Sequence, residues 1–137
     1  MRDPEISFSP WTRRSERASL PGIGAPGIYA LAKFEAAPPG PADPRAQQVI
    51  YIGETCASLR RRWAFFNGSA FEGKSGHSGG KIYQQEYGDD GADLYVTALP
   101  VDSVREQTRP FYIRYVERKL IWEYVETWGG APSCNRR

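Results

Sequence analysis

The chain has 137 residues, of which 40% are hydrophobic and 25% are charged, and its net charge is +2. A chain of this length is typical of one domain, and no apolar run approaches the roughly 20 residues that a membrane-spanning helix needs. We therefore expect a single cytoplasmic domain over residues 1–137 that has no membrane partner. The two cysteines form neither a CxxC nor a zinc-type spacing, so reduced thiols are expected.

The basic residues are mostly arginines, and they are clustered along the chain. The clusters are Arg13, Arg14 and Arg17, then Arg60, Arg61 and Arg62, and finally Arg136 and Arg137. Guanidinium groups bind phosphate through paired hydrogen bonds that an ammonium group cannot make. The clusters therefore favour a phosphate-bearing partner, although similar clusters also occur on ordinary solvated surfaces.

The residue pattern predicts an N-terminal arm and three strands. Residues 1–26 carry proline, glycine and charge with only scattered apolar positions, which is typical of a loosely structured arm. Residues 27–34 and 48–53 are rich in β-forming side chains, and the proline-rich residues 35–47 predict an exposed loop that joins them as an antiparallel pair. Residues 93–99 alternate as a third strand.

A short helix and an irregular insertion are expected between the second and third strands. Ser58 can cap a helix whose apolar side is formed by Leu59, Trp63 and Phe66. The glycine and serine content of residues 67–91 predicts an irregular insertion after this helix.

Residues 110–128 predict a long helix that begins with a proline and ends at a pair of glycines. At 100° per residue, one apolar stripe contains Ile113, Val116, Leu120, Tyr124 and Trp128. Glu117 lies near the middle of this stripe. A carboxylate among apolar neighbours costs several kcal/mol unless a cation or hydrogen-bond donors compensate. Glu117 therefore needs a partner that the helix itself does not supply.

Five short motifs occur in order along these elements. They are Gly27-Ile28-Tyr29, Tyr51-Ile52-Gly53, Leu59-x-x-Arg62, Glu117-x-x-x-Ile121 and Pro132-x-x-Asn135. Either triplet alone has little diagnostic value. The whole set, which spans most of the chain, resembles the motifs of the GIY-YIG nuclease family. The resemblance implies an α/β fold of the α+β kind, in which helices flank a small three-stranded antiparallel sheet, the GIY-YIG endonuclease fold.

The resemblance also implies a catalytic surface with one metal ion. Its residues would be Tyr29, Tyr51, Arg62, Glu117 and Asn135. Glu117 would be the only protein ligand of Mg²⁺ or Mn²⁺, and Arg62 would bind the scissile phosphate. Tyr29 would act as general base, and Tyr51 would hold the attacking water or a metal-bound one. Asn135 would order the site by hydrogen bonding.

Two positions depart from the family pattern. The usual spacing after the second triplet selects Arg61, whereas the Leu-x-x-Arg spacing selects Arg62, which we prefer because Leu59 fixes the phase of the helix. Many members carry a histidine one helical turn after that arginine, where this chain has Phe66. The only histidine is His77, which either loops back to the site or takes no part in the chemistry.

Strand alternation places a possible charge near the first tyrosine. Tyr29 is expected to share a strand face with Leu31 and Lys33, and Tyr51 is expected to share one with Val49. A phenol with a pKa of about 10 needs nearby positive charge to act as a phenolate at neutral pH. Lys33 could supply part of that charge or could be plain surface, and both interpretations stay open.

The sequence therefore predicts a metal-dependent endonuclease that cuts DNA and leaves a 5′ phosphate and a 3′ hydroxyl. Two alternatives stay open: a DNA-binding module or subunit that keeps the fold without cutting, and a structural or protein-interaction domain in which the triplets occur by chance. Arg60, Arg61 and Lys81 are candidates for contacts with DNA. Because one shallow site with a low net charge predicts weak binding, we expect a homodimer or a larger DNA-bound partner protein.

Overall fold

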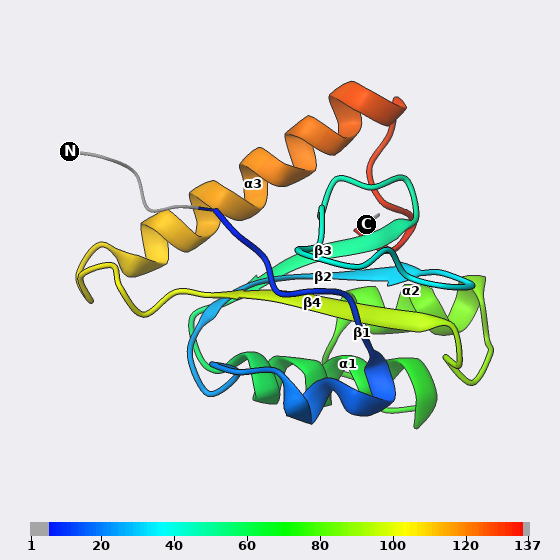
Figure 1. Cartoon of the computed structure of the whole chain (residues 1–137). Coiled ribbons are helices and arrows are strands. Elements are labelled where there is room, and N and C mark those ends of the chain that lie inside the picture. Colours follow the sequence, from blue (N-terminus) through cyan, green and yellow to red (C-terminus); the bar gives the residue numbers. More distant parts are fainter. Residues whose placement is uncertain (1–5, 136–137) are drawn as a thin grey trace.

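Residues 6–135, which the computed structural model describes, form a mixed α/β structure in which helices cover both faces of an antiparallel sheet (Figure 1). The strands are β1 (Thr12–Arg13), β2 (Gly27–Lys33), β3 (Val49–Thr55) and β4 (Leu94–Pro100), and the α-helices are α1 (Leu59–Phe71), α2 (Ser78–Glu86) and α3 (Arg109–Trp128). Two short 3-10 helices are η1 (Arg14–Ser19) and η2 (Ser133–Asn135). Residues 1–5 of the predicted arm and the two C-terminal arginines lie outside the described residues.

The sheet has four strands in the order β1-β4-β2-β3, so the predicted three-stranded sheet is wrong. The additional strand comes from the segment that the sequence predicts to be loose, and its Thr12 pairs with Val96 of β4. Phe8 and Trp11 of this segment are buried in the core. Removing two aromatic side chains from water offsets the entropy cost of ordering a few residues, which explains why the segment packs on the sheet.

A β-bulge interrupts the pairing of the two strands that carry the tyrosine motifs. Leu31 pairs with Tyr51, but Ala32 pairs with Val49, so Ile50 is the extra residue on β3. Ile50 and Tyr51 pack on one side of the sheet, whereas Val49 packs on the other. The predicted shared face of Tyr51 and Val49 is therefore wrong, because a bulge breaks the two-residue alternation of a strand.

The long helix α3 covers one face of the sheet, as its apolar stripe predicts (Figure 1). Its buried residues are Ile113, Val116, Leu120 and Tyr124. Trp128 is 43% exposed, so its place in the buried stripe is wrong. Its indole N–H instead donates to the carbonyl of Arg45 at 2.8 Å, and Gly129 ends the helix with a φ of 87°. Over the described residues, no helix has the length and apolar character needed to cross a membrane.

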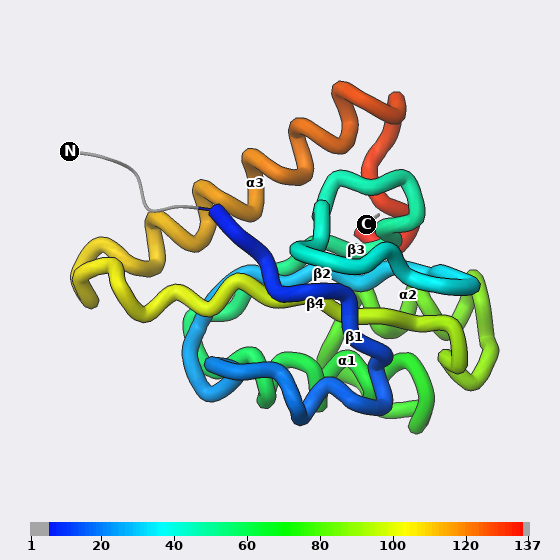
Figure 2. Tube along the Cα trace, viewed as in Figure 1, coloured from blue at the N-terminus to red at the C-terminus, as the bar shows by residue number. Residues whose placement is uncertain are grey.

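The opposite face is covered by α1 and α2, so the predicted irregular insertion over residues 67–91 is wrong. Figure 2 shows both helices on the side of the strands away from α3. Ser58 caps α1 as predicted, but the helix continues to Phe71, and α2 follows after a short connection. A Cβ on Gly80 would lie 2.7 Å from the carbonyl oxygen of Phe66. Glycine here allows two helices to approach closely rather than making the chain irregular.

Candidate functional site

Tyr29 and Tyr51 lie side by side on the face of the sheet that α1 and α2 cover. Tyr29 is fully buried on β2, Tyr51 is half-buried on β3, and their ring centroids are 5.9 Å apart. Gly53 pairs with Tyr29 across the two strands. A Cβ on Gly53 would lie 2.8 Å from the hydroxyl oxygen of Tyr29 and 2.5 Å from Cε2 of Tyr51. The glycine of the second triplet therefore leaves the space that both phenol rings occupy.

His77 reaches Tyr29 from the start of α2. Its Nε2 lies 2.9 Å from the hydroxyl oxygen of Tyr29, and the imidazole is buried. The backbone N–H of His77 donates to Oγ of Ser69 at 3.0 Å, and its Nδ1 accepts the backbone N–H of Gly80 at 3.1 Å. The structure thus brings the single histidine back to the first tyrosine, from a helix that the sequence did not predict.

These contacts determine which ring nitrogen of His77 carries the proton. Burial and the positive charge of Arg62 lower the pKa of His77 to about 3, so the ring is neutral at pH 7. Because Nδ1 accepts a hydrogen bond, the single ring proton is on Nε2 and is donated to the oxygen of Tyr29. His77 therefore does not take the proton of Tyr29. It supplies a neutral donor, which favours negative charge on the phenol oxygen.

Burial keeps both phenols protonated at neutral pH. Desolvation raises the pKa of Tyr29 well above its ordinary value, and it raises the pKa of Tyr51 as well. The positive charge of Arg62 acts in the opposite direction on both hydroxyls. The resting site therefore holds two neutral phenols next to one guanidinium.

Arg62 lies closer to Tyr29 and Tyr51 than the neighbouring arginines of α1 do. It is half-buried on α1, and its charge influences Tyr29, Tyr51 and His77. Arg61 is exposed, with its guanidinium 5.5 Å from the ring centroid of Phe65. Arg60 on α1 and Lys81 on α2 are exposed too. Of the two arginines that the sequence left open, Arg62 is the one beside the tyrosines.

Glu117 acts on the same group of side chains from α3. It is half-buried in the apolar stripe, and its negative charge raises the pKa of Tyr51. This helix packs on β3, the edge strand that carries Tyr51. We call Tyr29, Tyr51, Arg62, His77 and Glu117 the tyrosine cluster.

Asn135 attaches the end of the described chain to the edge of β3. Its Oδ1 accepts the backbone N–H of Ile52, and its Nδ2 donates to the carbonyl of the same residue, both at 2.9 Å. Ile52 lies between Tyr51 and Gly53 in the second triplet. Asn135 therefore orders the tyrosine cluster through the backbone of β3.

Lys33 lies at the opposite end of β2 from Tyr29, where it is held by ion pairs. Its Nζ forms ion pairs with Asp89 at 2.5 Å and with Asp93 at 3.1 Å, and it donates to the hydroxyl of Tyr83 at 3.2 Å. Burial opposes the charge of Lys33, but these hydrogen bonds prevail and raise its pKa. The structure thus places Lys33 in a local ion-pair network rather than beside the first tyrosine.

Ser69 holds His77 in place, and the sequence analysis did not single it out. Ser69 is buried on α1 within the segment that was predicted to be irregular. Its position follows the helical spacing of Trp63 and Phe66, because residues three or four apart share a helix side. Continuing that period beyond Phe66 would have found it.

The donors of the tyrosine cluster fit a metal ion that is held mainly by water and substrate. Within residues 6–135, no three His, Cys, Asp or Glu side chains come together in a way that could enclose a metal ion. The cluster has one carboxylate, that of Glu117, which acts on the phenol of Tyr51. Mg²⁺ is commonly bound by one or two carboxylates together with water and phosphate oxygens. Such an ion would need the phosphate of a substrate to complete its ligands.

No family model, curated protein or solved structure matches the chain.

Proposed function

We propose that the protein is a metal-dependent endonuclease of the GIY-YIG type, which hydrolyses DNA phosphodiester bonds and leaves a 5′ phosphate and a 3′ hydroxyl. The observation that carries the proposal is the tyrosine cluster, in which side chains from two strands and three helices act on one another. Phosphodiester hydrolysis needs a positioned water, stabilisation of charge on phosphoryl oxygens and help for the leaving oxygen. The cluster has candidate groups for each requirement.

Arg62 is suited to bind the scissile phosphate. Arg62 is half-buried, and its positive charge favours the ionised form of both neighbouring phenols. A guanidinium donates two parallel hydrogen bonds to a phosphate, and loss of one such preorganised donor costs about 10²–10³-fold in rate. Exposed Arg60, Arg61 and Lys81 would add contacts to the DNA backbone.

Tyr29 is suited to receive the proton of the attacking water. Its oxygen accepts the Nε2–H of His77, and its own O–H is directed at the half-buried Tyr51. Once that proton has passed to solvent by way of Tyr51, the phenolate oxygen can take a proton from water while the water oxygen bonds to phosphorus and the bond from phosphorus to O3′ breaks. The released O3′ then takes a proton from solvent, which gives the 3′ hydroxyl. Arg62 and the Nε2–H of His77 both favour the phenolate, although burial opposes it.

Glu117 would hold the metal ion that the proposal requires. When bound, Mg²⁺ or Mn²⁺ supplies positive charge at the phosphoryl and leaving oxygens. Tyr51, on which Glu117 acts electrostatically, would hold a water next to that ion. The five family motifs described above agree with this assignment of roles.

Nicking of supercoiled plasmid in Mg²⁺ or Mn²⁺ tests the proposal. We expect Glu117→Gln to lose about 10²-fold or more of the wild-type rate, because the carboxylate charge is gone. Glu126→Gln is the matched control, since Glu126 is exposed on the same helix and should cut normally. Wild-type activity in Glu117→Gln would exclude Glu117 as the metal ligand. Salt-dependent DNA binding without nicking by the wild type would instead identify a non-cleaving DNA-binding module.

A further inference from the structure

α3 carries a second stripe of large side chains on the side that faces away from the sheet. Phe111, Tyr115 and Trp122 are 72%, 54% and 61% exposed, and Val125 is 36% exposed. Together with Arg118 they follow one another at alternating intervals of four and three residues, which places them along one side of the helix. We call these five residues the outer stripe.

The outer stripe is large for a surface in contact with water. From the usual areas of aromatic side chains, the exposed fractions correspond to on the order of 400 Å² of mostly apolar surface. A stable protein interface buries about 800 Å² on each partner. The stripe therefore supplies roughly half of what an interface needs, and the polar flanks of α3 can supply the rest.

We propose that the outer stripe is a dimer interface, in which two copies of the chain pair their α3 helices antiparallel about a two-fold axis. Reversing the helix direction about residue 120 matches four of the five stripe residues to one another, and Phe111 then lies opposite the C-terminal end of the other helix, at position 129. Tyr115 then faces Val125 of the other copy, and Arg118 faces Trp122 of the other copy. This is the side-chain layering of an antiparallel coiled coil. A guanidinium over an indole is a favourable contact, so Arg118 fits in an otherwise apolar stripe.

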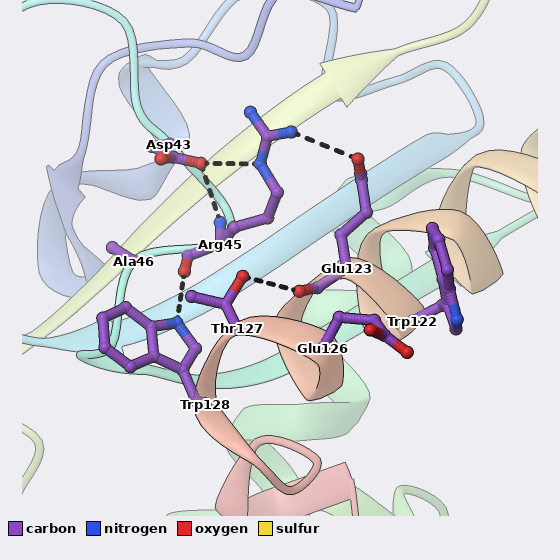
Figure 3. A pocket seen from close by; sticks show the side chains of 8 residues that line it. All are labelled: Asp43, Arg45, Ala46, Trp122, Glu123, Glu126, Thr127 and Trp128. Atoms are coloured by element: carbon purple, nitrogen blue, oxygen red, sulfur yellow. Dashed lines mark hydrogen bonds and ion pairs between the residues drawn. The ribbon is translucent and has the colours of Figure 1, made fainter.

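The exposed charges along α3 also favour an antiparallel pair. Arg114 and Arg118 are exposed in the first half of the helix, and Glu126 is exposed in the second half. Figure 3 shows this second half, where Trp122, Glu123 and Glu126 line a groove of about 410 Å³. Glu123 is paired with Arg45 at 3.5 Å, so Glu126 is the carboxylate that a second copy would meet. A second copy running in the opposite direction places its basic half over this acidic end, whereas a parallel copy would place like charges together.

Sedimentation of the full chain at several concentrations tests the dimer. We expect the wild type to dimerise with a dissociation constant in roughly the micromolar range, because the area is at the lower end for stable interfaces. Tyr115→Ala combined with Trp122→Ala should remain monomeric. Phe65→Ala is the matched control, because Phe65 is 42% exposed on α1 and should leave the dimer intact. Circular dichroism would verify that all variants fold, as expected for exposed positions.

Cysteine cross-linking tests the antiparallel direction. In a Cys56→Ser background, the double variant Tyr115→Cys/Val125→Cys should form disulfide-linked dimers under mild oxidation. The single variant Tyr115→Cys should not, since an antiparallel pair places the two copies of position 115 about 15 Å apart along the helix. Cross-linking of Tyr115→Cys to itself would overturn the arrangement. A wild type that stays monomeric, or a stripe variant that still dimerises, would overturn the interface itself.

Discussion

The helices on the two faces of the sheet bury different kinds of side chain. On the α3 face, the helix buries Ile113, Val116, Leu120 and Tyr124, of which Tyr124 alone has a polar atom. On the α1 and α2 face, Asn67, Ser69 and His77 are buried together with the hydroxyl of Tyr29. Buried polar groups need hydrogen-bond partners and contribute little net stability. Both faces contain a hydrophobic core, and the α1 and α2 face adds the buried polar groups on which the proposed chemistry depends.

Glu117 is the exception to this difference between the two faces. It is the half-buried carboxylate in the apolar stripe of α3, and its charge acts on Tyr51 of the opposite face. The edge strand β3 makes this possible, because α3 packs on the same strand that carries Tyr51. Variants on the two faces should therefore separate stability from activity, with Glu117 grouped with the active face.

Leu120→Ala should have the largest effect on stability. Leu120 is 2% exposed in the core between α3 and the sheet, and truncating a buried leucine costs about 2–5 kcal/mol through lost apolar burial and the cavity left behind. Urea unfolding measures this loss. The folded fraction should nick plasmid normally at low temperature. A specific loss of activity with unchanged stability would contradict the assignment of this face to structure.

Arg62→Lys should have a large effect on activity although the side chain changes little. A lysine keeps the charge but loses the paired donors of a guanidinium, so we expect a loss of roughly 10²-fold in nicking rate. Arg61→Lys is the matched control, because Arg61 is exposed over Phe65 and should change the rate by less than about twofold. Equal nicking rates for the two variants would show that Arg62 contributes no more to catalysis than Arg61 does.

His77 should make the fold sensitive to mild acid. Its pKa in the folded protein is about 3, below the ordinary value of 6.5, because burial disfavours the charged ring. Between these two values the unfolded chain binds a proton that the folded chain does not. The contribution of His77 to stability is thus complete above pH 6.5 and is lost as the pH falls toward 3, by about 1.4 kcal/mol per pH unit.

The pH dependence of urea unfolding isolates this effect. Wild type and His77→Gln should be compared at pH 7, 6 and 5, since glutamine does not titrate. The wild type should lose more free energy of unfolding over this interval than the variant does. Parallel curves for the two proteins would mean that His77 is not buried in its neutral form.

The sequence predicts those parts of the fold where side-chain period and burial agree. β-forming side chains indicate β2 and β3, alternation indicates β4, and the 3.6-residue period gives α3 with its end at Gly129. β1 could not be predicted, because two residues carry no pattern and the strand depends on packing of Phe8 and Trp11. α2 was missed because its glycines serve close packing of helices, which has the same composition as a loop.

The residues of the candidate site could also be predicted only where they lie on elements with a clear sequence pattern. Tyr29, Tyr51 and Arg62 lie on elements that the sequence predicts, and the family resemblance implies that they lie together. His77 could be placed only with α2 known, since its ring position depends on Ser69 and on the first turn of that helix. Long-range packing of this kind leaves no local signal in the chain.

A pair of tyrosine variants, one on each face, tests the central claim most directly. Tyr29 and Tyr124 are both buried, and the hydroxyl of Tyr124 donates to the carbonyls of Gln47 and Val49. Tyr29→Phe should lose about 10²-fold or more of the plasmid-nicking rate while remaining folded, because its oxygen takes part in proton transfer. Tyr124→Phe should lose about 1 kcal/mol of stability and cut normally. Wild-type nicking by Tyr29→Phe would contradict the account.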